Sequence, residues 1–518
     1  MKLCDCRFLN VEGSRNHKCT AGRGVSPLKS DPHNSFFQYE NRALLPFVRN
    51  AILIAAAMAM TGCNLAPRYT RPPLPVARTY PAPDSAGPNP ATATTAWRSY
   101  FADRRLQQVI ALALENNRDL RQAAHRVQEA RAVYGIQRAD LFPTVDAGSN
   151  VIRTRIPGDP TLTGPAVNLT YKQVALSTVG WEVDFWGRLR NLKDVALQEY
   201  FASEEARRAV VVSLIADVAD TWFRVRELDE RILLARRTVA SRTESYRLFT
   251  RRVEVGSTSR LDLTQVEVLL RQAESLLAEL EQERDAQVHA LTLLVGTPAP
   301  LPFSEEPFND QGIMQELRVG LPSELLRSRP DIIEAEHQLV AAHANIGAAR
   351  AAFFPGVVLT GSGGTASFEL NGLFAASGFS SQGLFTSTSA TWSFLPHISV
   401  PIFDAGRNRN NLNLAQARRN DAVANYEKTI QTAFRDVSDA LSNQKWLAEQ
   451  LKVQQATLAA ETERARLATL RYNAGSAPYL DVLDAQRDVL SSEQQVVHVR
   501  RELLSSRVRL YEALGGGA

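Results

Sequence analysis

Two similar halves follow one another in this chain of 518 residues, and this repeat limits the possible folds more than any other feature of the sequence. Residues 119–143 align with 331–355 at a separation of 212, and residues 252–262 align with 471–481 at a separation of 219. The separation grows by seven between the two alignments, so the second half carries a longer insert. Tandem copies of one unit bury their apolar faces against each other, and we therefore expect two equivalent halves within one fold.

The second alignment falls on two helix-to-helix turns. A helical pattern breaks at 473–478 and then resumes. Within this break, Gly475 suits the left-handed residue past a helix end, and Pro478 suits the first turn of the next helix. The first half has the same turn around Gly256. Each turn is therefore predicted to be the tip of a helical hairpin.

Very long helical patterns lead into these tips. They cover 187–255 in the first half and 406–472 in the second, and a shorter helical pattern covers 97–139. At about 1.5 Å per residue, the first long pattern extends on the order of 100 Å. No globular domain needs such helices, and each returns through a tip, so they are expected to form a packed antiparallel array.

Four segments have the composition of β-strands: 144–156, 168–184, 356–368 and 389–403. In the last of them, apolar side chains alternate with Thr, Ser and His over about ten residues, which is typical of transmembrane β-strands. A half-buried hairpin in a soluble domain has the same pattern. On the membrane interpretation, the side chains that face lipid are Trp392, Phe394, Ile398 and Val400.

Four strands cannot close a barrel, and an open sheet edge is not tolerated in lipid. Other copies of the chain must therefore supply the missing strands. Two copies give eight strands, which fill their interior with side chains, whereas three copies give twelve, which leave room for a conduit. The polar strand faces favour the water-filled alternative.

The apolar run 51–60 follows Arg42 and Arg49 and ends at Thr61-Gly62-Cys63. It is too short to span a bilayer but suits the core of a signal peptide. Small residues directly before Cys63 resemble a bacterial lipobox, in which the cysteine is acylated and becomes the new N-terminus. The alternative is an ordinary secretory signal with a chance cysteine. The polar residues before Leu44 do not resemble a signal, and Leu44 or Leu45 is the more natural start.

Removal of residues 1–62 would leave 51 basic and 51 acidic residues, so the basic balance of the full chain does not indicate a nucleic-acid partner. Cys63 would be the only cysteine left, which excludes an intrachain disulfide. The sequence contains no phosphate-binding glycine loop, no metal-spaced Cys/His cluster and no nucleophile elbow. We therefore expect no enzyme, no metal and no cofactor apart from the lipid on Cys63.

The expected organisation follows the repeat. The parts are a removed leader (1–62), a lipid-anchored Pro-rich strap (63–96), the first repeat (97–295), a crossover (296–322) and the second repeat (323–518). The first repeat contains the hairpin 144–184 and the tip near Gly256, and the second contains the hairpin 356–403 and the tip near Gly475.

Four motifs, at 60–63, 320–332, 352–355 and 471–486, resemble the outer-membrane factor family of tripartite efflux pumps and type I secretion systems, the TolC-like channels. The similarity is greatest to its lipoprotein branch, which includes OprM-type and NodT-type proteins. The resemblance implies a mainly α fold with a transmembrane β part, in which three subunits form a 12-stranded barrel joined to a long periplasmic helical barrel. It also implies an outer-membrane exit duct of a Gram-negative-type cell that works with a periplasmic adaptor and an inner-membrane transporter.

By the same resemblance, Asp481 and Asp484 form an acidic gate at the periplasmic end, with Arg487 as its basic neighbour. The residues that meet the adaptor are then Gly256, Ser257, Tyr472, Gly475 and Ser476. The sequence alone also allows plainer interpretations. A helix dipole favours carboxylates in a first turn, and Arg487 suits an i,i+3 pair with Asp484 on one helix.

A different class of protein also fits part of the pattern. Long helical hairpins occur in soluble periplasmic adaptors or scaffolds that have no pore. The four strand segments and the internal repeat argue against this alternative.

Overall fold

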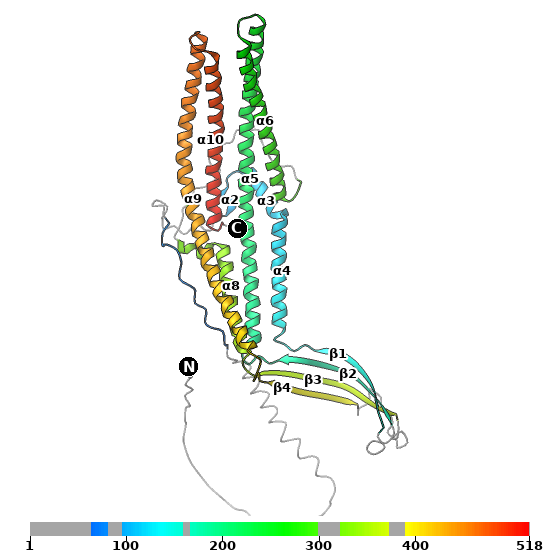
Figure 1. Cartoon of the computed structure of the whole chain (residues 1–518). Helices are drawn as coiled ribbons and strands as arrows, with labels where there is room; N and C mark the ends of the chain where they lie inside the picture. The colour runs from blue at the N-terminus through cyan, green and yellow to red at the C-terminus, as the bar shows by residue number, and fades with distance from the viewer. Residues whose placement is uncertain are drawn as a thin grey trace, which may run out of the picture. The chain divides into compact units, whose positions relative to one another are not determined.

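The computed structural model describes residues 64–80, 96–158, 166–298, 317, 322–371 and 389–516. The chain divides into two compact units, 1–61 and 62–518, and all described residues belong to the second. Within that unit, long helices run side by side and a sheet lies at the end opposite the helix tips (Figure 1). Among the described residues, no helix is both long enough and apolar enough to cross a membrane.

From α4 and α8 onward, both halves contain the same elements in the same order, whereas the short elements before them differ. The first half has α2 (Trp97–Tyr100), α3 (Arg104–Asn116), α4 (Arg118–Ala139), β1 (Asp146–Ile156), β2 (Val167–Glu182), α5 (Arg188–Glu254) and α6 (Arg260–Val295). The second half has a 3-10 turn η2 (Pro322–Glu324), α7 (Leu325–Ser328), α8 (Pro330–Ala351), β3 (Gly356–Asn371), β4 (Ala390–Ser399), α9 (Arg407–Asn473) and α10 (Tyr479–Ala513).

The predicted helix 97–139 is divided into three helices. Asp103 and Asn117 cause the breaks, because each is an N-cap whose side chain accepts a backbone hydrogen bond from the helix that follows. The acceptor distances are 2.8 Å from Arg105 N and 2.9 Å from Leu120 N. The long helices agree with the prediction, since α5 and α9 each contain 67 residues.

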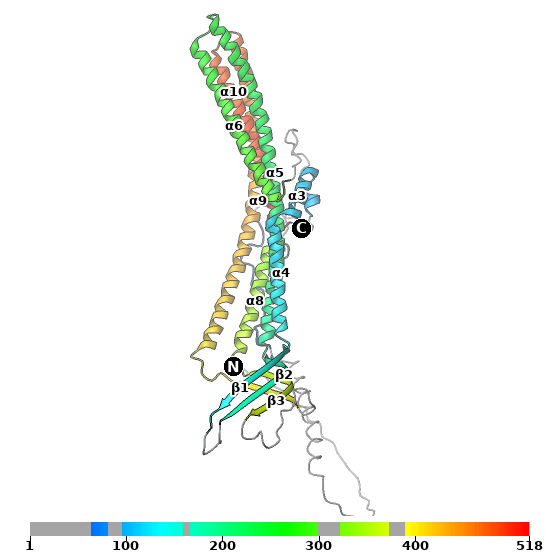
Figure 2. The same ribbon diagram turned by 90° about the vertical axis from the view of Figure 1, so that its right-hand side faces the viewer.

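Helix α5 is the central element. It packs against α4 and α8 near the sheet, and against α6 and α10 near the tips (Figure 2). The largest apolar core lies between these two regions, where α2 and α3 cover α5, α6 and α10. Tyr100 and Tyr511 stack there at 4.7 Å, and Trp222 of α5 is buried in the same core. This core joins the two halves at the middle of the helices.

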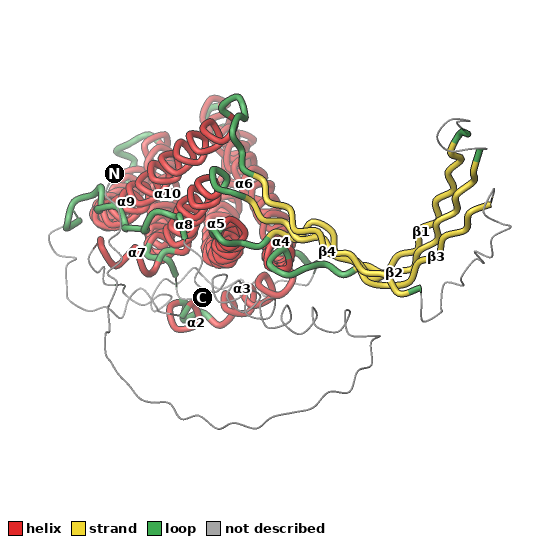
Figure 3. Tube along the Cα trace, turned by 90° about the horizontal axis from the view of Figure 1, so that it is seen from below, coloured by secondary structure: helices red, strands yellow, loops and turns green. Residues whose placement is uncertain are grey.

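The sheet has the order β1-β2-β3-β4, and all its pairs are antiparallel. A bulge between Thr178 and Trp181 interrupts the pairing of β2 with β3. The sheet curves away from the helices (Figure 3). In the described part of the chain, β1 and β4 each pair on one side only, so both edges of the sheet are open.

The two faces of the sheet differ in chemistry. Directly paired residues share a face, so Trp392 lies beside Gly363 and Leu176. This face carries the exposed apolar side chains Val151, Val174, Leu176, Trp392, Phe394 and Ile398. The other face is mixed: the Ser362 and Ser393 hydroxyls lie 2.8 Å apart there, and the exposed apolar side chains Ile152, Phe368 and Leu395 also lie on it. Strand β4 ends at Ser399 and contains Pro396, which an edge strand tolerates.

The Pro-rich segment 64–80 lies along α8 and α9 rather than forming a helix. The Arg71 guanidinium donates to both oxygens of Glu336, at 2.9 and 2.7 Å, and Tyr69 OH donates to the same carboxylate at 3.0 Å. Further along, Tyr80 stacks on Phe434 of α9 at 5.1 Å. These contacts hold the segment as an extended strap on the second repeat.

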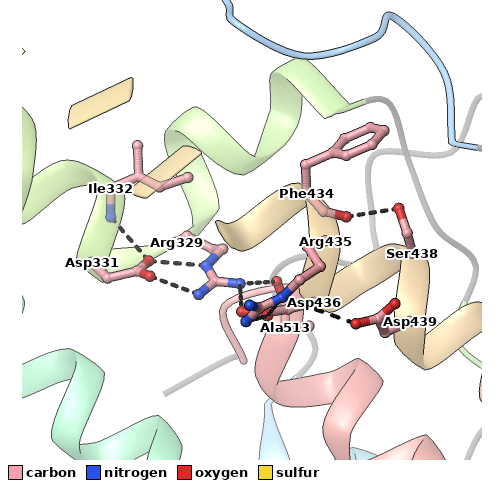
Figure 4. Close-up of polar contacts among 9 residues, drawn as sticks. All are labelled: Arg329, Asp331, Ile332, Phe434, Arg435, Asp436, Ser438, Asp439 and Ala513. Carbon is pink, nitrogen blue, oxygen red and sulfur yellow. Dashed lines mark hydrogen bonds and ion pairs between the residues drawn. The ribbon is translucent and has the colours of Figure 1, made fainter. Parts of the chain in front are cut away.

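The motif at 320–332 has a structural role at the junction of α8, α9 and α10 (Figure 4). The Arg329 guanidinium donates to both oxygens of Asp331, at 2.9 and 2.6 Å. It also donates to the carbonyl of Ala513 at 3.2 Å and to Asp436 at 3.4 Å. Because this side chain is only 12% exposed, it fastens the start of α8 to the end of α10 and to α9.

Candidate functional site: the helix tips

The two tips have the same backbone design. Gly256 and Gly475 both adopt the left-handed conformation, with φ of 70° and 72°. In each tip, the serine after the glycine donates two hydrogen bonds, from its backbone N–H and from its hydroxyl, to the carbonyl of the residue five positions earlier. A side chain at either glycine position would be strained, which explains why both turns contain glycine.

The turns themselves face outward. The predicted contact residues Gly256, Ser257, Gly475 and Ser476 are all exposed. Around them, Val255 is 77% exposed, Leu261 67% and Leu480 42%. An exposed apolar rim around a polar turn is typical of a protein-binding surface.

Inside this rim, the two tips contact each other. Arg252 of the first tip donates to the Tyr472 hydroxyl of the second at 2.5 Å. Tyr472 packs on Tyr479 at 4.8 Å, and Tyr479 packs on Phe249 at 4.5 Å. Tyr472 was predicted as a partner contact, and the structure also places it in this internal contact. Arg252, Phe249 and Tyr479 were not among the predicted site residues, because their role arises only from contacts between the two halves.

A small apolar cluster supports the contact between the tips. Phe249 of α5, Val266 of α6 and Leu483 of α10 are each less than 5% exposed and pack together. Tyr246, Leu263, Leu269 and Tyr479 surround them. The cluster holds the start of α10, which carries the predicted gate residues, against the hairpin of the first half.

Asp481 differs from its equivalent in the first half. Asp262 is part of a capping box and accepts hydrogen bonds from the Ser259 hydroxyl at 2.7 Å and the Thr258 hydroxyl at 2.9 Å. Those bonds hold the pKa of the Asp262 carboxyl below its usual value. Asp481 follows Pro478, which offers no such cap, and no hydrogen bond or ion pair reaches its exposed carboxylate within the described residues. Asp481 is therefore available to groups outside its own chain.

Asp484 belongs to a chain of charges along α10. Arg487 lies 3.3 Å from Asp484 and 3.1 Å from Asp488, and Arg464 of α9 lies 2.6 Å from the other oxygen of Asp488. The hydrogen bond from Arg464 lowers the pKa of the Asp488 carboxyl. The i,i+3 pair of Asp484 with Arg487 is therefore present. Asp488 and Arg464 were not among the predicted site residues, although Asp488 stands four residues after Asp484 on the same helix.

These charges belong to the second half alone. The first half has Gln265, Val268 and Leu269 at the positions of Asp484, Arg487 and Asp488. The scaffold of the tip is thus shared by both halves, whereas this network of charges lies only on α9 and α10 of the second half.

The other predicted site residues lie elsewhere. Trp392, Phe394 and Ile398 share the apolar face of the sheet, and Val400, which is 55% exposed, follows the end of β4. Cys63 and the leader lie outside the described residues. Within the part of the chain that the structure describes, no group of three or more His, Cys, Asp or Glu side chains could hold a metal ion.

Comparisons with known proteins agree with this architecture. Residues 109–297 and 321–516 match the family described as "Outer membrane efflux protein". The solvent efflux pump outer membrane protein SrpC of Pseudomonas putida is 41% identical over 467 residues, which cover 89% of this chain and 97% of SrpC. The outer membrane protein OprJ of Pseudomonas aeruginosa is 39% identical over 469 residues, with coverage of 90% and 95%.

Solved structures show the same fold. A membrane protein from Pseudomonas aeruginosa superimposes with a TM-score of 0.81 at 39% identity and covers 88% of this chain and 98% of its own. The open state of the Neisseria gonorrhoeae MtrE outer membrane channel superimposes with a TM-score of 0.77 at 36% identity, again with coverage of 88% and 98%.

Proposed function

Because the chain belongs to the outer membrane efflux protein family, we propose that it works as a homotrimer whose helix tips form the gate and meet a periplasmic adaptor. Membership of the family makes the chain an outer-membrane efflux channel that extends into the periplasm, and not an enzyme. The observation that carries the proposal is the four-stranded sheet with two open edges. An open edge cannot face lipid, so further copies must pair with β1 and β4.

The internal repeat supports a contact between subunits through α4 and α9. Gly347 of α8 faces α5 so closely that an added Cβ would lie 2.7 Å from Asn191 Nδ2. Its equivalent, Gly135 of α4, meets nothing within 4 Å, and the equivalent of Asn191 is Asn410 of α9. We expect α9 of one subunit to cover α4 of the next, as α5 covers α8 within one chain.

Disulfide crosslinking tests this contact, since Cys63 would be the only native cysteine in the mature chain. Gly135→Cys with Asn410→Cys should give covalently linked trimers on a non-reducing gel. Gly347→Cys with Asn191→Cys is the matched control, because its bond should form within one chain. Crosslinking of the control pair without any linkage between chains for the first pair would contradict the trimer contact.

The proposed cargo is small molecules delivered by an inner-membrane transporter. The relatives SrpC and TtgI are named for solvent and toluene efflux, and ArpC is named for antibiotic efflux. The exposed apolar rim around the tips, Val255, Leu261 and Leu480, supports docking of an adaptor there.

A photocrosslinking residue at Leu261 should capture the adaptor in cells. Leu293, which is 79% exposed near the other end of α6, is the control position. Mass spectrometry of the products identifies the captured protein. The same product from both positions, or none from Leu261, would contradict docking at the tips.

The lipid anchor on Cys63 rests on the lipobox-like sequence alone. Cys63→Ser should abolish incorporation of radiolabelled palmitate, whereas Cys19→Ser, which alters the leader, should leave it unchanged. Palmitate that still enters the Cys63→Ser protein would refute the assignment. The apolar face with Trp392 and Phe394 is proposed to contact the membrane lipid.

A further inference from the structure

A cavity of 490 Å³ lies among α5, α6 and α10, beside the charged part of α10. Its lining includes Arg231 and Arg242 of α5, Leu276 of α6, and Arg487, Leu490 and His498 of α10. Among the described residues that line it, none is acidic. Three arginines and a histidine line the cavity, and whether it favours an anion depends on which of them already contact carboxylates: His498 contacts Glu227 at 3.0 Å.

Two of the three arginines already have partners. Arg231 pairs with Glu227 at 3.3 Å and donates to Gln494 at 2.6 Å. Arg487 pairs with both Asp484 and Asp488. Their charges are therefore largely balanced, and the remaining positive charge of the cavity wall belongs to Arg242.

Arg242 is a buried cation without an anion. Arg242 as a whole is 5% exposed, and its Nη1 donates a hydrogen bond to the Leu269 carbonyl at 2.5 Å. Nη2 is buried and has no acceptor among the described residues. Burial lowers the pKa of Arg242, and the nearby Arg487 lowers it further. An unpaired buried charge is strongly unfavourable, so this guanidinium is suited to receive an anion from outside the chain.

One acidic residue, Glu493, lines a second, smaller cavity of 290 Å³ that Arg242 borders. No ion pair joins the two side chains among the described residues, and the charge that acts on Glu493 is that of Arg237. Burial raises the pKa of the Glu493 carboxyl.

We propose that the larger cavity binds a small organic anion, whose carboxylate pairs with Arg242 and whose apolar body lies against Leu276 and Leu490. A volume of 490 Å³ lies within the range of small-molecule sites, about 300–1,000 Å³, and exceeds what a bare inorganic ion fills. The amides of Gln272 and Gln495 and the hydroxyl of Ser491 provide further hydrogen-bonding groups.

A ligand bound in this cavity would affect the position of α10, which carries the proposed gate residues. The cavity takes its walls from the hairpin of the first half and from α10, which carries Asp481 and Asp484. A ligand that contacts all three helices stabilises the arrangement in which they surround it. If the helix tips form the gate, as proposed above, an organic acid in this site favours the arrangement of the tips described here.

Titration with benzoate tests the proposal on the detergent-solubilised full chain. Wild-type protein should bind benzoate saturably in isothermal titration calorimetry, and neutral benzamide should bind at least about tenfold more weakly, because it lacks the charge. Arg242→Met should weaken benzoate binding by about tenfold or more. The control Arg247→Met, which alters an exposed arginine paired with Glu244 on the same helix, should leave it unchanged.

Three results would overturn the proposal. One is the absence of saturable benzoate binding to the wild type. Another is equal binding to wild type and Arg242→Met. A third is binding of inorganic phosphate but not of benzoate, which would show that the cavity binds inorganic ions and not an organic anion. If Arg242→Met does not fold, crystals soaked in 4-bromobenzoate decide the matter, since the bromine should appear among α5, α6 and α10 and its absence there refutes the site.

Discussion

Asp262 and Asp481 occupy equivalent positions in the two halves, yet they make different contacts. The Asp262 carboxylate accepts bonds from Ser259 and Thr258 and completes a capping box. Pro478 stands at the N-cap of α10, so the Asp481 carboxylate has no such local donors. One aspartate therefore stabilises its helix, whereas the other is left for interactions beyond the chain.

The capping box gives the first prediction. Ser259→Ala should destabilise the first turn of α6 by about 1 kcal/mol, measured as faster amide hydrogen exchange there. Because its bonds hold the pKa of Asp262 below the unfolded value of about 3.9, the stabilisation is complete above that pH. It should be lost as the pH falls through the lower folded pKa. Ser476→Ala, a change in the other tip, should leave exchange in α6 unchanged.

The carboxylates of α10 give the second prediction. If Asp481 and Asp484 from three subunits approach one axis, they form a site for cations. Asp481→Asn with Asp484→Asn should then weaken block of single-channel current by divalent cations added from the periplasmic side. Asp285→Asn, on the exposed surface of α6, is the control. Unchanged block in the double variant would assign both carboxylates to the helix dipole or to the adaptor.

At the scale of elements, a buried ionic network joins α5 to α10. Glu227 and Arg501 are each about 5% exposed and lie 2.7 Å apart. Arg231 and His498 also contact Glu227, at 3.3 and 3.0 Å. A buried pair of this kind fixes which residues of two helices face each other, because the charges are satisfied in one arrangement only.

Removal of the shared acid should therefore be costly. Glu227→Gln removes the carboxylate that Arg501, Arg231 and His498 share and leaves Arg501 paired with Glu502 alone, at 2.6 Å. It should destabilise the folded protein by about 1–3 kcal/mol, measured by thermal or chemical unfolding in detergent. Glu244→Gln, which alters an exposed pair with Arg247, should have no measurable effect. Equal stability of the two variants would mean that water reaches the α5–α10 contact.

Some elements could be predicted from the sequence and others could not, for a physical reason. The strands and the 67-residue helices follow from local patterns, namely alternation along β4 and helical spacing along α5 and α9. The contact of Arg252 with Tyr472 spans 220 residues and that of Glu227 with Arg501 spans 274. Such pairs depend on how helices of different halves pack, which no local pattern records. The breaks at Asp103 and Asn117 were missed because the apolar spacing continues across them.

At the scale of the whole molecule, one chain is an incomplete channel. Its sheet has two open edges, and Gly135 faces open space where Gly347 is covered. Three copies would supply twelve strands, an even number that membrane barrels allow. The helix tips would then surround one axis at the periplasmic end, held by contacts such as that of Arg252 with Tyr472.

The most direct test of this account is single-channel recording in planar bilayers after that contact is removed. Arg252→Gln with Tyr472→Phe deletes the bond between the tips while it keeps the shapes of both side chains similar. We predict a clear increase in conductance over the wild type, whereas Arg247→Gln, on the exposed face of α5, should conduct like the wild type. An unchanged low conductance of the double variant, in a protein that still inserts as a trimer, would contradict a gate at the helix tips.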